Sequence, residues 1–189
     1  MAAILHGQNL DFLKSSIRVP SGADVRASHL LLDIRFRLFY ADLMKAIVIL
    51  GTGRGDSNTL AAVRELCPFS DYRLIDLRQI EIAPYSYDGP HPDDDFLKVA
   101  QEMESAEYIV FATPVYWYAM SASLKNFFDR LSDLLSAYKP IGKGLKGKKT
   151  YLISTGSGPA MPPGFEEPFR LTSEYFDMEF QKSFYKSVR

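Results

Sequence analysis

The sequence predicts an α/β fold in which a five-stranded parallel sheet carries helices on both faces. Two observations lead to this prediction. From residue 44 onward, short apolar runs alternate with segments of helical pattern, as expected when each strand is followed by a crossover helix. The first apolar run also ends at glycines, which is typical of a buried parallel strand.

The first part of this domain supplies two strands and one helix. Residues 45–50 (KAIVIL) form the first predicted strand, residues 59–66 the first helix and residues 72–76 the second strand. Residues 79–92 hold three prolines and a glycine, so they are predicted to be a loop.

The middle part continues the alternation. Residues 93–105 are predicted as a helix, with three aspartates at its positive end. Residues 108–112 (YIVFA) form the third strand. Residues 121–137 form a long helix in which six apolar side chains recur at helical spacing.

The last part completes the sheet. Residues 150–154 (TYLIS) form the fourth strand, residues 164–176 a helix and residues 179–185 the fifth strand. Five such strands suit the flavodoxin-like order 2-1-3-4-5 in a three-layer sandwich. The sequence ends soon after the fifth strand, so we expect the usual last helix to be missing. One face would then be bare, or covered by the N-terminal residues or by a partner.

Residues 1–43 lack this alternation and are predicted to be an appendage to a domain of residues 44–189. Met44 lies directly before the first strand, and one hypothesis is that it is the true start of the protein. Sequencing the N-terminus of the native protein tests this hypothesis, and finding residues 1–43 intact would count against it.

Composition argues against several function classes. The formal net charge is -1, whereas nucleic-acid binding usually brings a strong basic excess and a carrier that docks on basic partners is usually acidic. No run approaches the roughly 18 apolar residues of a membrane span. The N-terminus also lacks the layout of a signal peptide. We therefore expect neither nucleic acid nor a membrane as a partner.

The single cysteine, Cys67, excludes an intramolecular disulfide and a cysteine-ligated iron–sulfur cluster. This usage fits a reducing compartment, so the cytoplasm is the predicted location. Cys67 precedes Pro68, where a helix is expected to end, and is interpreted as a structural residue and not a redox thiol. No metal site is predicted.

A glycine-rich loop, residues 51–59 (GTGRGDSNT), follows the first strand. Glycines let the backbone approach a ligand closely, and free amides at a helix start attract an anion. Ser57, Asn58 and Thr59 add polar side chains there, and Arg54 supplies charge unless it only faces solvent. This combination suits a terminal phosphate monoester. The simpler alternative is a turn in which Ser57 is an N-cap.

Two other nucleotide motifs can be compared with this loop. The NTPase phosphate loop needs a Gly-Lys-Ser/Thr sequence, and that lysine is absent. The dinucleotide pattern G-x-G-x-x-G needs glycine at position 56, which is aspartate. Asp76 nevertheless lies about the right ~20 residues downstream for a ribose contact, so the dinucleotide alternative is weakened and stays open.

Three adjacent aromatic residues, beginning with Tyr116 and Trp117, follow the third strand soon after Pro114 and Val115. They cannot all face the core, so some project into the loop, where flat apolar groups can flank a planar ring. The amides of residues 115–117 are candidates to bond the ring's carbonyls and nitrogens. Alternatively, the aromatic side chains pack on a neighbouring subunit or cap the core.

Four small residues, Thr155, Gly156, Ser157 and Gly158, follow the fourth strand. Small residues let a ring system lie against backbone amides, and a generic turn is the alternative. Ligands of such sheets bind beyond the carboxyl ends of the strands. Three ligand-shaped loops at three strand ends therefore predict one shared site.

Residues 113–131 (TPVYWYAMSASLKNFFDRL) resemble the signature of flavodoxin-like NAD(P)H-dependent FMN reductases and related quinone reductases. GTGRGDSNT is similar to the phosphate loop of that family, and the resemblance covers nearly all of residues 45–188. It implies that Ser57, Asn58 and Thr59 hold the FMN phosphate and that residues 114–117 and 155–158 border the isoalloxazine ring. Residues 1–43 have no counterpart in the family core.

The predicted activity is transfer of a hydride from NAD(P)H to FMN and then to a small acceptor, such as a quinone or free flavin, in the same slot. The cofactor carries the difficult step, so no catalytic side chain is predicted. His91 is expected to be an exposed loop histidine. The loop at residues 79–92, with Tyr85 and Tyr87, is either a wall of the acceptor site or a solvated lid without contacts.

The sequence leaves three alternatives to this activity open. One is a non-enzymatic flavodoxin-type electron carrier, and a second is a nucleotide-binding or structural α/β module without flavin. A specialised quinone or azo reductase is a third, on which the sequence is silent. Phe127, Phe128 and Leu131, near Tyr116 and Trp117, suggest a homodimer with its interface beside the flavin, although a long core helix would give the same pattern.

Overall fold

The computed structural model describes residues 45–188, so the predicted N-terminal appendage lies outside the described residues. The described part contains one five-stranded sheet, and every neighbouring pair of strands is parallel. Its strands are β1 (Ala46–Leu50), β2 (Arg73–Asp76), β3 (Tyr108–Pro114), β4 (Lys149–Gly156) and β5 (Glu179–Ser187). The order is β2-β1-β3-β4-β5, which confirms the predicted topology.

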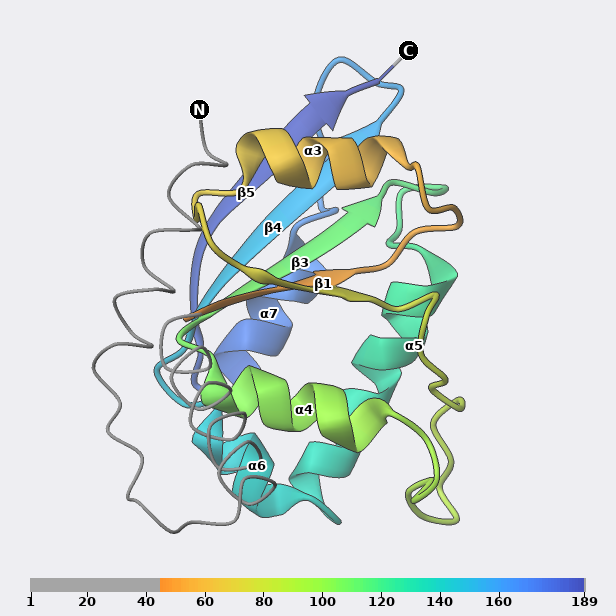
Figure 1. Ribbon diagram of the computed structural model, residues 1–189, viewed down its shortest axis with the longest axis vertical. Coiled ribbons are helices and arrows are strands. Elements are labelled where there is room, and N and C mark those ends of the chain that lie inside the picture. The colour runs from red at the N-terminus through yellow and green to blue at the C-terminus, as the bar shows by residue number, and fades with distance from the viewer. Residues whose placement is uncertain (1–44, 189) are drawn as a thin grey trace, which may run out of the picture. The chain divides into compact units, whose positions relative to one another are not determined.

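Helices cover the two faces unequally (Figure 1). Among the described residues, only α3 (Asn58–Leu66) packs on one face. The opposite face carries the other four helices. These are α4 (Phe96–Ser105), α5 (Ala122–Arg130), α6 (Lys139–Gly144) and α7 (Glu167–Tyr175). No described helix has the length and apolar character of a membrane span.

The two faces of the sheet bury separate apolar clusters. The larger cluster joins the sheet to the four-helix layer and includes Phe111, Phe127 and Phe169, all fully buried. The smaller cluster lies under α3, where the half-buried rings of Tyr151 and Phe184 continue it across β4 and β5. The alternation of strand residues between these clusters fixes which side chains point to which face.

The predicted helix over residues 121–137 is wrong in its second half. α5 ends at Arg130, a 3₁₀ segment (η1, Leu131–Leu135) follows, and α6 was not predicted. Arg130 Nε donates to Asp133 Oδ2 at 2.8 Å. Side chains three residues apart eclipse in a 3₁₀ helix, so this contact favours the tighter geometry. The spacing of apolar residues alone does not predict this change from an α-helix to a 3₁₀ helix.

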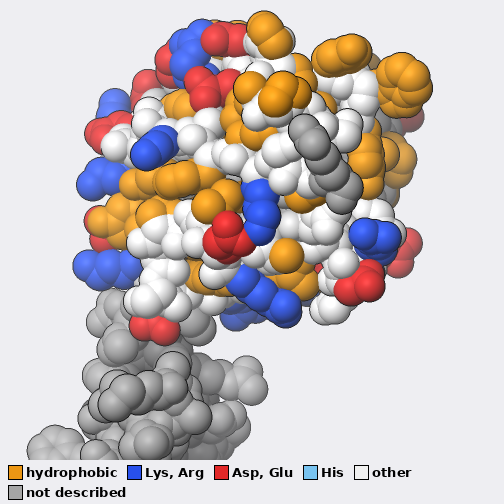
Figure 2. Space-filling view, turned by 90° about the horizontal axis from the view of Figure 1, so that it is seen from above, with side chains coloured by type: hydrophobic (Ala, Val, Ile, Leu, Met, Phe, Trp, Pro, Cys, Tyr) orange, Lys and Arg blue, Asp and Glu red, His pale blue; other side chains and the backbone are white. Residues whose placement is uncertain are grey.

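Charged side chains of both signs are interspersed with apolar ones on the upper face of the molecule (Figure 2). Elsewhere in the described chain, charged side chains form exposed pairs, such as Lys186 with Glu65 and Arg170 with Glu167. Exposed pairs of this kind contribute little stability, about 0–1 kcal/mol each, so the apolar clusters hold the fold.

Candidate functional site

Loops after β1, β3 and β4 meet at the carboxyl edge of the sheet and enclose a cleft of about 480 Å³. Ten of the twelve predicted site residues line it. They are Arg54, Ser57, Asn58, Thr59, Pro114, Val115, Tyr116, Thr155, Gly156 and Ser157. Trp117 and Gly158 do not line it, whereas Thr52, Gly53 and Val188 do and were not predicted. The cleft falls within the roughly 300–1,000 Å³ typical of small-molecule and cofactor sites.

The start of α3 leaves donors available to an anion. Ser57 is the N-cap, and its Oγ accepts from the Leu60 amide at 3.1 Å, so the N-cap interpretation is correct. The amides of Asn58 and Thr59 donate no hydrogen bond to another described residue. Since both residues line the cleft, this helix terminus can receive an anionic group.

The three polar side chains of this loop differ in the hydrogen bonds that they already make. The Thr59 hydroxyl is buried and lies 2.8 Å from the Thr155 hydroxyl, which ties α3 to β4. Ser57 uses a lone pair in capping. The Asn58 side chain makes no hydrogen bond to another described residue, so it is the least committed of the three.

Two arginines flank the loop in different ways. Arg54 lines the cleft with 66% of its side chain exposed, and its Nε is 3.9 Å from Asp56. Arg78 lies behind the loop, where its guanidinium would touch a Cβ placed on Gly55. Arg78 also binds the Asp76 carboxylate through its Nε at 3.1 Å and its Nη2. Asp76 is thus already paired, which argues against the ribose contact of the dinucleotide alternative.

The aromatic loop after β3 forms a tight two-residue turn. Tyr116 and Ala119 exchange backbone hydrogen bonds of 2.9 and 3.0 Å. Between them, Trp117 and Tyr118 have φ angles of 48° and 65°, a left-handed conformation that is unfavourable for bulky residues. Their side chains are 93% and 76% exposed. Trp117 therefore projects into solvent instead of lining the cleft.

This geometry corrects the expected use of the turn's amides. The Val115 amide donates to the Thr155 carbonyl at 2.7 Å, and the Tyr116 amide donates to Ala119. Only the Trp117 and Tyr118 amides donate to no other described residue. Of the three amides predicted to face a ring, one is available.

Contacts from β5 support the loop after β4. The Val188 amide donates to the Gly156 carbonyl at 2.8 Å, and the Tyr185 hydroxyl donates to the Gly158 carbonyl at 2.9 Å. Neither Tyr185 nor Val188 was predicted at the site, because Tyr185 belongs to an ordinary strand, Val188 directly follows that strand, and no motif marks either residue. Their positions depend on the β4–β5 register.

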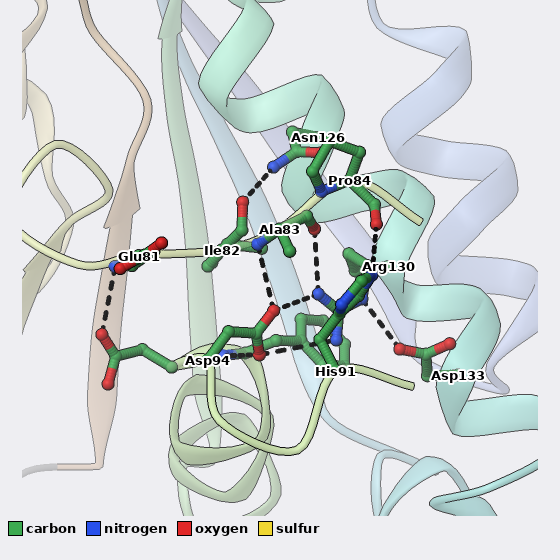
Figure 3. Close-up of polar contacts among 11 residues, drawn as sticks. Glu81, Ile82, Ala83, Pro84, His91, Asp94, Asn126, Arg130 and Asp133 are labelled. Atoms are coloured by element: carbon green, nitrogen blue, oxygen red, sulfur yellow. Dashed lines mark hydrogen bonds and ion pairs between the residues drawn. The ribbon is translucent and has the colours of Figure 1, made fainter. Parts of the chain in front are cut away.

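The loop at residues 79–92 is clamped to α5 (Figure 3). Asn126 Nδ2 donates to the Ile82 carbonyl at 2.7 Å, and Arg130 Nη1 donates to the Ala83 carbonyl at 2.9 Å. The rings of Tyr85 and Tyr87 contact each other edge to face and do not line the cleft, and Tyr87 is 96% exposed. The loop therefore makes contacts that a solvated lid would lack, and its two tyrosines lie outside the cleft lining.

A buried ion-pair network centres on Arg130, whose side chain is 1% exposed. It pairs with Asp94 and Asp133. Burial alone would raise the pKa of the Asp94 carboxyl, but hydrogen bonds from Arg130 and from the Phe96 and Ala83 amides lower this pKa below its usual value. The network fixes the loop and holds no free acid or base.

The other titratable side chains considered from the sequence, Cys67 and His91, have structural surroundings. Burial raises the pKa of the half-buried Cys67 thiol, so the unreactive protonated form is favoured. A ring nitrogen of His91 lies 3.0 Å from the Pro84 carbonyl and closes the base of its own loop. Within residues 45–188, no group of three or more His, Cys, Asp or Glu side chains could hold a metal ion.

Comparison with known proteins identifies what this arrangement resembles. The sequence pattern of the NADPH-dependent FMN reductase family matches residues 44–162. An NAD(P)H-dependent FMN-containing oxidoreductase of Bacillus subtilis, YwqN, is 30% identical over 121 residues, which cover 60% of this chain and 67% of the relative.

A second relative and one solved structure extend the comparison. An FMN-dependent NADH:quinone oxidoreductase of Burkholderia thailandensis is 34% identical over 77 residues, 38% of this chain and 39% of that protein. The chain thus matches about two fifths of that relative's length. General stress protein 14 of Treponema denticola, solved in complex with FMN, superposes with a TM-score of 0.55 at 22% identity, covering 75% of this chain and 84% of that one.

Proposed function

The chain belongs to the NADPH-dependent FMN reductase family, and we propose that its cleft holds the FMN through which NAD(P)H reduces a small acceptor. Members of this family are NAD(P)H-dependent oxidoreductases, and FMN is their cofactor. The observation that carries the proposal is the convergence of three loops on one cleft with uncommitted backbone amides.

The phosphate end is assigned to the start of α3. The Asn58 and Thr59 amides donate to the phosphate, and the Asn58 side chain adds a further donor. Ser57 can donate its hydroxyl proton while its lone pair caps the helix. Arg54, which lines the cleft, supplies the opposing charge. The partial positive charge of the helix end favours a dianion at this point.

The ring end is assigned to the loops after β3 and β4. Pro114, Val115 and Tyr116 line the cleft from the end of β3 and the turn after it, and the neighbouring Thr155, Gly156 and Ser157 line it from the end of β4 and the loop after it. When bound, FMN supplies the hydride acceptor and donor that the protein's own side chains lack. The Trp117 amide and the Ser157 amide are available donors toward ring heteroatoms.

No lining side chain acts as a general acid in this proposal. Among the described residues that line the cleft, Arg54 alone carries a formal charge. The protein's contribution is therefore binding, orientation and backbone dipoles, and protons reach the acceptor from water.

The acceptor is proposed to be a small planar molecule, such as a quinone or free flavin. Trp117 and Tyr118 directly follow Tyr116, which lines the cleft, and their rings are exposed, so we propose that they can lie against a planar molecule. The names of two relatives, an FMN-dependent NADH:quinone oxidoreductase and an NADPH azoreductase, support this proposal.

The absorption spectrum of the purified protein tests this function. We expect the bands of oxidised flavin, bleaching when NADPH is added without oxygen, and recovery on addition of a quinone. A protein without visible absorbance, even after incubation with FMN, would overturn the cofactor assignment. Bound flavin that NADPH fails to bleach would instead favour a single-electron carrier.

A homodimer in the cytoplasm is the proposed state of the protein, and we place its interface where the described chain leaves apolar side chains exposed. Of the predicted interface residues, Phe127 is fully buried in the core, whereas the partly buried Phe128 and the buried Leu131 line a groove. Exposed apolar side chains lie along this groove between η1 and α7, at Leu135, Leu171 and Tyr175. Sedimentation of the wild-type protein and of Leu171→Glu tests this interface, and an unchanged dimer in the variant would contradict it.

A further inference from the structure

Three hydrogen bonds fix the backbone that follows β4. The Thr155 carbonyl accepts from the Val115 amide, the Gly156 carbonyl from the Val188 amide, and the Gly158 carbonyl from the Tyr185 hydroxyl. The first two bonds come from the backbone. The third comes from a side chain, so it depends on residue identity.

Tyr185 stands against this loop at close range. In the β4–β5 register it pairs with Ser154, one row before Thr155, which lines the cleft. Its ring packs at Gly156 so closely that a Cβ placed on Gly156 would come within 2.8 Å of the Tyr185 hydroxyl oxygen. The absence of a side chain at Gly156 and the phenol of Tyr185 are therefore complementary in shape.

The hydroxyl also determines where one carbonyl is held. While the Gly158 carbonyl accepts from Tyr185, its oxygen is engaged by β5. The Ser157 and Gly158 amides donate to no other described residue, so they remain available to a ligand. A freed carbonyl dipole near an electron-rich ring would be repulsive, whereas free amides would be attractive.

We propose that Tyr185 is a positioning residue for the FMN ring, because its hydroxyl and ring set the place of the loop that borders the cleft. The proposal rests on the proposed FMN site. Tyr185 itself does not line the cleft and acts through Gly156 and Gly158.

The first test is Tyr185→Phe, which removes the hydroxyl and keeps the ring. We expect FMN titrated into the apoprotein to bind about threefold to tenfold more weakly, as loss of one hydrogen bond predicts. We also expect the midpoint potential of the bound flavin to become more negative, because a released carbonyl disfavours the reduced ring. A purely structural role would leave that potential unchanged.

The matched control is Tyr151→Phe. Tyr151 lies on the neighbouring strand but faces the α3 side, and its hydroxyl makes no hydrogen bond to another described residue. The same atom is removed from the same sheet, so affinity and potential should match the wild type.

A second test uses the close contact at Gly156. In Gly156→Ala the new methyl group meets the Tyr185 hydroxyl at 2.8 Å, whereas the next ring atom is 3.4 Å away. We expect the single variant to bind FMN at least tenfold more weakly, which corresponds to about 1.4 kcal/mol. The double variant Gly156→Ala/Tyr185→Phe should bind FMN no more weakly than Tyr185→Phe alone, because the clashing atom is gone.

The outcomes separate this proposal from the proposed function. If wild-type protein fails to bind FMN, the function itself fails. If the wild type binds FMN but Tyr185→Phe matches Tyr151→Phe in both affinity and potential, Tyr185 has no positioning role. Additive losses in the double variant would also overturn the proposal, since they would mean that the two positions do not act on one contact.

Discussion

Neighbouring residues at the start of α3 have separable roles. Asn58 is exposed and makes no side-chain hydrogen bond to a described residue, whereas Ser57 caps the helix. We expect Asn58→Ala to weaken FMN binding about tenfold, because a hydrogen bond to a charged group contributes ~1.5–3 kcal/mol. Urea unfolding of the apoprotein should be unchanged. Fluorescence quenching of titrated FMN measures the affinity.

Ser57→Ala is the matched comparison for that variant. It should lose FMN affinity and, in addition, about 1 kcal/mol of apoprotein stability, the usual contribution of an N-cap serine. Equal stability losses in the Ser57 and Asn58 variants would show that the two side chains share a structural role. An Asn58 variant with wild-type affinity would remove that side chain from the phosphate site.

Backbone strain in the aromatic turn suggests a second prediction. Tyr118 has a φ of 65°, which costs a residue with a Cβ about 1–2 kcal/mol relative to glycine, partly offset by the entropy that glycine loses on folding. We expect Tyr118→Gly to stabilise the apoprotein by about 0.5 kcal/mol or more. The same variant should raise the KM for a quinone, because it removes an exposed ring from the turn whose first residue, Tyr116, lines the cleft.

Tyr87→Gly is the control for strain. Tyr87 is also highly exposed, but it is not among the positive-φ residues, so glycine should bring no gain in stability. Thermal unfolding compares the two variants. A destabilised Tyr118→Gly protein with unchanged quinone kinetics would mean that the ring supports the fold and not the reaction.

At the scale of single residues, the sequence predicted those features that depend only on neighbouring residues in the chain. Ser57 as an N-cap and the glycine-rich loop follow from neighbouring residue types, so they could be predicted. Tyr185 and Val188 reach the site through the β4–β5 register, some thirty residues beyond Thr155. No local pattern encodes a contact between segments so distant, and the Trp117 φ angle is likewise a consequence of the finished turn.

Secondary-structure elements could be predicted where the apolar periodicity determines them. They were missed where a side-chain contact determines the local geometry. Strand positions followed from apolar runs, the parallel sheet followed from the alternation, and the order of the five strands followed from the flavodoxin-like pattern that they suit. The change from α5 to η1 coincides with the contact of Arg130 with Asp133. Apolar spacing continues unbroken across that point, so it could not reveal the change.

At the scale of elements, the clamp between α5 and the loop at residues 79–92 predicts that the stability of the protein depends on pH. Although burial opposes it, hydrogen bonds from Arg130 and two amides lower the pKa of Asp94 below its usual value. A lowered folded-state pKa stabilises the protein above the unfolded pKa of about 3.9 and loses that contribution as pH falls through the folded value. The clamp should therefore be intact at neutral pH and weaken below about pH 4.

Asp94→Asn tests this dependence. At pH 7 we expect the variant to be roughly 2 kcal/mol less stable, in line with loss of a charge-assisted hydrogen bond to a buried arginine. The difference from the wild type should shrink as pH falls below 4. Asp129→Asn, which removes only an exposed pair with Lys125, should show little difference at either pH. A pH-independent difference for Asp94→Asn would contradict the assignment.

At the scale of the whole molecule, every residue assigned to the FMN site lies within residues 45–188. Contacts within residues 44–189 group into a single compact unit. Both apolar clusters and the cleft are built from these residues, and the α3 face carries one helix among them. The chain that begins at Met44 therefore contains the complete described site.

A protein beginning at Met44 should consequently fold and bind FMN with the affinity of the full chain. Ligand binding to the folded state alone adds about 2.7 kcal/mol of stability at a concentration one hundred times Kd, so FMN should raise the Tm of both proteins equally. The Asn58→Ala variant of each should show a smaller shift at the same FMN concentration. Should the shorter protein aggregate or show no FMN-dependent rise in Tm, residues 1–43 would be part of the folding unit, and the division of the chain at Met44 would be wrong.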